Sequence, residues 1–232
     1  MQDNKPFIPV VEKAPADIYT ETEPNPDTLA ALGPLAPLAG TWYGKGGVDI
    51  NPKAEGAEAK AYQEYYEMVV ADPQNNGPQL LYPLRYHTHI VEPGTRLTFH
   101  DQVGYWLWDP AAEIVYMTAS IPRAQAWMCA GPAKADSKQF TLWAVRDTHI
   151  NTFASNPFIE AAFKTTEYKI TVTINDDGTW SYDQTTTLIV PNYPDPFEHR
   201  DTNTLEMVAP PGRNPGMIDA GIFPLKPKAE SK

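Results

Sequence analysis

The stretch Gly40-Thr41-Trp42-Tyr43-Gly44-Lys45-Gly46 most constrains what this chain can fold into. Side chains of a strand alternate between its two faces, so the glycines of this stretch share one face with Trp42. Glycine inside a strand costs stability unless a bend or a close approach of another group requires it. The stretch therefore predicts a strand that bends around one buried tryptophan, as in a small barrel. An ordinary glycine-rich edge strand is the alternative.

The rest of the chain has the pattern of short strands joined by turns. Asp176-Asp177-Gly178 is typical of a tight hairpin turn between two of them. We expect strands over 62–71, 79–91, 96–108, 113–121, 123–131, 140–146, 167–175, 179–190 and 197–208, and a loop over 51–60. Sequential strands with few helical crossovers predict an antiparallel sheet, and closure removes its edges. We therefore expect an all-β chain that forms an antiparallel up-and-down barrel of about ten strands, similar to lipocalins.

Proline-rich segments flank this expected barrel. Proline fixes φ and removes a backbone donor, so it excludes long helices and central strands. We predict a proline-rich N-terminal arm over 1–34, a barrel domain over 35–208 and a proline-rich C-terminal tail over 209–232. Short helices are expected over 27–32 and over 155–163. Four leucines are spaced to form an apolar lid on the barrel: Leu29, Leu32, Leu35 and Leu38.

Charge and composition restrict the classes of partner. The 232 residues carry a formal net charge of -11, which argues against nucleic acid and anionic membrane as partners. The single cysteine, Cys129, lies in an apolar run and is interpreted as a core residue. A chain without an internal disulfide fits a reducing, cytoplasmic location. We recognise no secretory signal and no apolar run near the ~20 residues of a membrane span.

Two histidines, His87 and His89, share one face of an expected strand. A His-x-His pair can supply two ligands to a metal ion. No obvious third ligand accompanies this pair, so two outward, solvated histidines are the preferred interpretation. On the next strand, His100 shares a face with Gln102 and Trp106, and a core histidine bonded to a neighbour is preferred there.

The last expected strand places His199, Asp201 and Asn203 on one face, opposite a face of charged and hydroxyl residues. We therefore expect these three side chains to point into the barrel. Inward polar groups need hydrogen bonds to one another, to a ligand or to trapped water. His199 is thus a candidate haem or metal ligand, and a closed polar network is the alternative. The chain contains no nucleophile elbow, phosphate loop or dinucleotide fingerprint.

Several stretches together resemble the nitrobindin-like barrels, which are related in shape to fatty-acid-binding proteins. Leu35–Gly46 fits the Gly-x-Trp-x-Gly-x-Gly signature of that family. Phe99–Tyr105 is similar to its Leu-His-x-Glu-x-Gly-Tyr/Phe pattern, and Ala119–Gly131 is similar to its next hairpin. His199 falls on the last strand, where the family carries its histidine.

The resemblance implies a barrel that holds ferric haem b through a histidine on the last strand. It implies His199 as the ligand of the haem iron, His100 on the opposite wall and Lys164 as a further cofactor-binding residue. We expect the ligand site to include four more side chains: Trp42, Trp106, Asp201 and Asn203. Haem-bearing members of the family react with nitric oxide and isomerise peroxynitrite to nitrate.

Three hypotheses on function follow. The first is the binding of a small hydrophobic molecule inside the barrel, with haem b as one candidate. The second is a haem-dependent peroxynitrite isomerase. The third is a barrel filled by its own side chains, with an interaction role on its surface. A monomer and a homodimer both stay open.

Overall fold

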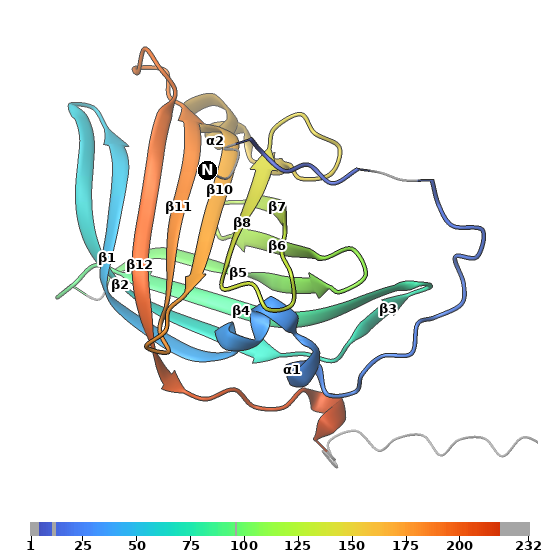
Figure 1. Cartoon of the computed structure of the whole chain (residues 1–232). Helices are drawn as coiled ribbons and strands as arrows, with labels where there is room; N and C mark the ends of the chain where they lie inside the picture. Colours follow the sequence, from blue (N-terminus) through green and yellow to red (C-terminus); the bar gives the residue numbers. More distant parts are fainter. Residues whose placement is uncertain (1–4, 11–12, 96, 219–232) are drawn as a thin grey trace, which may run out of the picture.

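Figure 1 shows the computed structural model of the chain, which describes residues 5–10, 13–95 and 97–218. The strands are β1 (Gly40–Lys53), β2 (Gly56–Val70), β3 (Gln74–Asn76), β4 (Gln79–Val91), β5 (Thr98–Asp109), β6 (Ile114–Ile121), β7 (Gln125–Pro132), β8 (Gln139–Val145), β9 (Phe153–Ser155), β10 (Lys164–Ile174), β11 (Trp180–Ile189) and β12 (Phe197–Ala209). The helices are α1 (Thr28–Ala31) and α2 (Pro157–Ala162), and the 3-10 turns are η1 (Gly33–Leu38) and η2 (Pro215–Met217). None of the helices in these ranges has the length and apolar character needed to cross a membrane.

Ten of the strands in the described ranges form a closed antiparallel barrel. Their order around the barrel is β2-β1-β12-β11-β10-β8-β7-β6-β5-β4. Pairing of β2 with β4, from Gln63 opposite Val91 to Val70 opposite Leu84, closes the ring. The short strands β3 and β9 pair with β4 and β7 outside it. The prediction of an all-β, antiparallel barrel of about ten strands is confirmed.

The loop predicted over 51–60 is wrong, because β1 and β2 form one long hairpin. β1 continues to Lys53, which lies opposite Gly56 of β2. Solvent reaches both faces at this end of the hairpin, so the residues lack the apolar alternation that marks a half-buried strand. Ion pairs lie here instead: the Glu58 carboxylate is 3.6 Å from Lys53 Nζ across the hairpin and 3.8 Å from Lys60 Nζ on its own strand.

The glycines of β1 make room for inward side chains of neighbouring strands. A Cβ atom on Gly44 would lie 2.3 Å from Asn203 Nδ2, and one on Gly47 would lie 2.1 Å from the Tyr62 ring. The register of β1 with β2 shifts between Gly44 and Gly47. Even-numbered residues such as Trp42 therefore point inward before the shift, and odd-numbered residues such as Asp49 point inward after it. This irregularity puts a carboxylate on the inner face where simple alternation predicts an outer residue.

We expect Gly47→Ala to lower the free energy of unfolding by about 1–3 kcal/mol, the usual cost of overpacking, because its methyl group would overlap the Tyr62 ring. Gly46→Ala is the matched control. No atom lies within 4 Å of the place of its Cβ, so a change within about 0.5 kcal/mol is expected. Urea denaturation of both variants measures the difference. Equal stabilities would contradict the close approach at Gly47.

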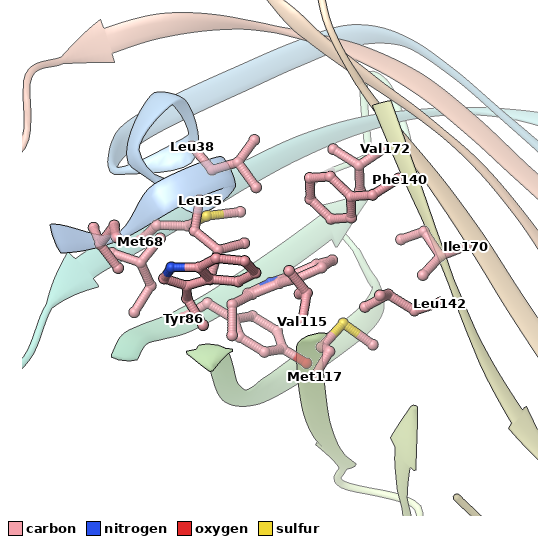
Figure 2. Packing of buried hydrophobic residues seen from close by; sticks show 14 of the residues in the cluster. Leu35, Leu38, Met68, Tyr86, Val115, Met117, Phe140, Leu142, Ile170 and Val172 are labelled. Carbon is pink, nitrogen blue, oxygen red and sulfur yellow. The ribbon is translucent and has the colours of Figure 1, made fainter. Parts of the chain in front are cut away.

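Apolar and aromatic side chains fill one half of the barrel. Figure 2 shows Leu35 and Leu38 of η1 beside side chains from β4, β6, β8 and β10. Leu32, Leu35 and Leu38 are fully buried, so the predicted apolar lid is present. Trp42 is 1% exposed and donates from Nε1 to the Leu38 carbonyl oxygen at 2.7 Å. Its ring meets that of Trp180 edge to face, with the centroids 6.2 Å apart. This end of the barrel is therefore closed.

The two flanking arms are joined at this closed end. The Asn214 amide accepts from the Thr28 backbone N–H at 3.2 Å and donates to the Pro26 carbonyl at 3.1 Å. It also donates to Asp72 Oδ1 at 2.6 Å. Asp27 caps α1, in the helix expected over 27–32, by accepting from the Ala30 N–H. Residues 219–232 of the predicted tail lie outside the described residues.

Candidate functional site

The other half of the barrel contains a cavity of about 580 Å³. This volume lies within the range of about 300–1,000 Å³ that is usual for small-molecule sites. Much of its wall is apolar and includes Ile90, Phe99, Ile121, Trp127, Phe153 and Leu188. Phe158 and Phe163 at the two ends of α2 also line it and are 68% and 38% exposed, so the cavity opens to solvent beside this helix. The barrel is thus not filled throughout by its own side chains.

A histidine between two carboxylates forms one wall of the cavity. Asp49 of β1 lies directly opposite Asp201 of β12, and both side chains point inward. His199 Nε2 lies 2.5 Å from Asp49 Oδ1 and 3.6 Å from Asp201 Oδ2. A carboxylate at this distance accepts a hydrogen bond, so Nε2 carries the proton. In the described part of the chain, no hydrogen bond is seen to the other ring nitrogen, Nδ1.

The three groups shift one another's acidity. Burial alone would lower the pKa of His199, but the hydrogen bond to Asp49 and the nearby negative charges raise it overall. Burial works to raise the pKa of Asp49, and its hydrogen bond and attraction to His199 outweigh this and lower it. Burial, with the charge of Asp49, raises the pKa of Asp201 to about 7 against the attraction of His199. Asp49 is therefore the carboxylate that holds the His199 proton.

His100 lines another part of the cavity and is held by a directional chain of hydrogen bonds. The Thr118 carbonyl can only accept, so the Tyr86 hydroxyl donates to it at 3.0 Å and accepts from Gln102 Nε2 at 2.7 Å. Gln102 Oε1 is then left to accept from His100 Nε2–H at 3.2 Å. His100 Nδ1 therefore carries the lone pair. Burial lowers the pKa of His100, which keeps this ring neutral.

A buried carboxyl group, Glu64 of β2, lies in the wall where the cavity meets the filled half. It is 2% exposed and accepts from Thr88 Oγ1 at 2.8 Å, from the Tyr182 hydroxyl at 2.8 Å and from Asn203 Nδ2 at 2.9 Å. The Tyr182 hydroxyl also lies 2.7 Å from that of Tyr62. Burial raises the pKa of Glu64 despite these three donors. Asn203 therefore belongs to a buried polar network centred on Glu64, which is separate from the contacts of His199 with Asp49 and Asp201.

Neither Asp49 nor Glu64 was predicted as a site residue from the sequence. Glu64 shares its parity with Tyr62, Tyr66 and Met68, which are buried, so strict alternation along β2 would have pointed it inward. The sequence gives a weaker indication that Asp49 points inward. The adjacent glycines before it allow the register shift that turns it inward, but the size of that shift cannot be read from the sequence.

The structure brings only some of the predicted site residues together. Those that line the cavity are His100, Trp106, His199 and Asp201. Asn203 is buried behind the wall on Glu64, and Trp42 lies in the filled half. Lys164 is exposed at the start of β10, where Thr165 points inward instead. Cofactor binding by Lys164 and ligand binding by Trp42 and Asn203 stay predictions.

The interpretations of the remaining histidine pair and of the cysteine are confirmed. His87 and His89 point outward from β4, and His87 Nε2 lies 3.0 Å from Asp101 Oδ2 on the outer face of β5. Cys129 is fully buried, and burial raises the pKa of its thiol well above the ordinary value. Neither feature belongs to the cavity wall.

Comparisons with known proteins agree with this architecture. A family model described as "THAP4-like, heme-binding beta-barrel domain" matches residues 31–206. Among solved structures, the crystal structure of Rv2717c from M. tuberculosis is similar, with a TM-score of 0.55 and 17% sequence identity. The match covers 78% of this chain and 96% of that one. At this identity the likeness concerns the fold alone. No curated protein matches the chain.

Proposed function

Because this chain belongs to the family of THAP4-like, heme-binding beta-barrel domains, we propose that its cavity binds a small, largely apolar molecule and that this molecule is haem b. The apolar walls suit the faces of a macrocycle, which loses contact with water on binding. Arg123 lines the exposed part of the cavity and can pair with acidic substituents that stay near solvent.

The observation that carries the proposal is the pairing of His199 with Asp49. Histidines that bind metals usually donate their other ring N–H to a carboxylate, which fixes the ring and makes the ligating nitrogen more basic. His199 donates Nε2–H to Asp49, which is 1% exposed, and Nδ1 is left for iron. The side chain of His199 is 30% exposed, so the ring remains accessible from the cavity. The donor set therefore fits a haem.

His199 would hold the haem iron, Asp49 would orient His199, and His100 would face the cavity from its own strand. A bound haem iron supplies the position at which nitric oxide or peroxynitrite reacts in the enzymatic alternative. His100 has a neutral ring with a fixed lone pair, so it can accept a proton or hydrogen bond from a molecule in the cavity. Ligand binding is the proposal that the geometry supports; isomerase activity requires haem binding first.

Titration of the full-length protein with hemin tests the proposal. We expect a saturable shift of the Soret absorption band that is abolished in His199→Ala, because the iron loses its protein ligand. Asp49→Asn keeps His199 but weakens its carboxylate partner, so its affinity for hemin should fall by about 10–100-fold. His89→Ala is the matched control, because His89 points outward from β4. It should bind hemin as the wild type does.

Two results would contradict the assignment. An unchanged Soret band in His199→Ala would mean that another residue holds the iron. The absence of a specific shift in the wild type would show that the cavity holds a different molecule. Native mass spectrometry of the purified protein would then identify a small molecule that co-purifies with it. Thermal melts of each variant establish that it is folded.

A further inference from the structure

We propose that Asp49, His199 and Asp201 form a binding site for a divalent transition-metal ion in the haem-free protein. The proposal does not depend on haem binding, because it uses the other ring nitrogen of His199. One ligand atom from each of the three side chains lies within 4.8 Å of the others. Zinc binds histidine nitrogen and carboxylate oxygen at about 2.0–2.2 Å, so its ligands lie ~3–4 Å apart. Small side-chain movements therefore suffice to hold an ion.

The arrangement of charge favours a cation at this place. Asp49 and Asp201 are directly opposite residues of β1 and β12, and like charges in such a cross-strand pair repel. Their side chains are only 1% and 13% exposed, so water screens them weakly. His199 lies against both carboxylates, with Nε2 2.5 Å from Asp49 Oδ1 and 3.6 Å from Asp201 Oδ2. When both are ionised, as metal binding requires, the two carboxylates balance the charge of one divalent ion.

Amide groups orient both carboxylates. Asn51 Nδ2 donates to Asp49 Oδ2, and Gln184 Nε2 donates to Asp201 Oδ2 at 3.1 Å. Gln184 is fixed in turn by the Tyr168 hydroxyl, which donates to its Oε1 at 2.8 Å. Supporting hydrogen bonds of this kind are a regular part of metal sites, because they hold the ligands in place before the ion arrives. His199 and Asp201 also line the cavity, which gives an ion room for water or a bound anion.

The ligand types select the class of ion. One imidazole and two carboxylates suit zinc, manganese, iron or cobalt, and three ligands leave open positions on the ion. A neutral imidazole has one lone pair, so His199 cannot serve a divalent ion through Nε2 and haem iron through Nδ1 at the same time. Zinc and hemin should therefore compete for the protein.

Isothermal titration of the haem-free, full-length protein with Zn²⁺, and absorption spectroscopy with Co²⁺, test this site. We expect binding of one ion per chain in the wild type and loss of binding in both His199→Ala and Asp201→Asn. Gln184→Ala should weaken the affinity by about 10–100-fold, since it removes a supporting hydrogen bond. The variant with both His87→Ala and His89→Ala is the control, because that pair lies on the outer face beside Asp101. It should bind zinc as the wild type does.

The outcomes separate the metal site from the haem site. Zinc binding that persists in Asp201→Asn, is lost in the outer-face double variant or is missing from the wild type would overturn the proposal. Hemin titration of Asp201→Asn then tests haem separately, because this variant keeps His199 and its partner Asp49. A normal Soret shift in a variant that has lost zinc binding supports both proposals. Zinc binding by a wild-type protein that shows no Soret shift with hemin supports the metal site alone.

Discussion

Trp42→Ala should lower the free energy of unfolding by about 3–5 kcal/mol, the range measured when large aromatic residues are truncated in a core. Trp42 is 1% exposed, and its ring fills the closed end of the barrel between the η1 leucines and Trp180. The substitution removes this volume and also leaves the Leu38 carbonyl oxygen without the indole donor. Urea denaturation followed by circular dichroism measures the loss.

Two further variants show where this loss comes from. Trp42→Phe keeps most of the volume and removes the hydrogen bond to Leu38, so a smaller loss is expected, about 1 kcal/mol from the bond. Tyr105→Ala truncates an aromatic residue that is 44% exposed and should change the stability little. If Trp42→Ala changes the free energy of unfolding by little, Trp42 does not stabilise the closed end.

Glu64→Ala should destabilise the protein by about 3 kcal/mol. The substitution leaves the hydroxyls of Thr88 and Tyr182 and the amide of Asn203 without their shared acceptor, and each buried unpaired donor costs about 1–3 kcal/mol. Water from the adjoining cavity can replace part of these bonds, and Tyr182 keeps its contact with Tyr62, which holds the loss below the full sum. An unchanged urea midpoint would show that the network adds nothing to stability.

Glu64→Gln isolates the charge of this group. Burial raises the pKa of Glu64 above its ordinary 4.5, so the folded protein holds this proton to a higher pH than the unfolded chain does. The stability gained by holding this proton is present below pH 4.5 and is lost as the pH rises through the pKa of Glu64 in the folded protein. Glutamine does not ionise and shows no such loss. The variant should therefore gain stability relative to the wild type as the pH rises above 4.5, and a pH-independent difference would contradict this.

The sequence predicts the barrel well because each strand needs only its own alternation and its turns. β10 and β11 illustrate this: both strands lie where expected, and the Asp-Asp-Gly turn joins them. Tyr168, Ile170 and Val172 of β10 alternate with polar residues and point inward. The inward direction of His199 was predicted in the same way, since β12 is regular around it. Local rules of this kind fix which side chains face the interior.

The partners of His199 required information that is not local. Asp49 reaches it only because β1 changes register between Gly44 and Gly47, and a shift of one residue reverses the faces of a strand. The division of the interior into a filled and an empty half depends on how η1 packs against strands that are distant in sequence. For this reason the sequence suggested Trp42 for the ligand site, although it lies among the leucines of the closed end.

The seam between β1 and β12 joins the first strand of the barrel to the last, with Trp42 opposite Met207. During synthesis, the free edge of β1 has no partner on that side until nearly the whole domain has left the ribosome. The loop entropy of such a distant pairing must be overcome before its contacts form, which slows folding. Until then the nascent sheet keeps two open edges, the usual starting point for wrong pairing between chains. A closed ring of this kind thus leaves the newly made chain dependent on protection until β12 has emerged and paired with β1.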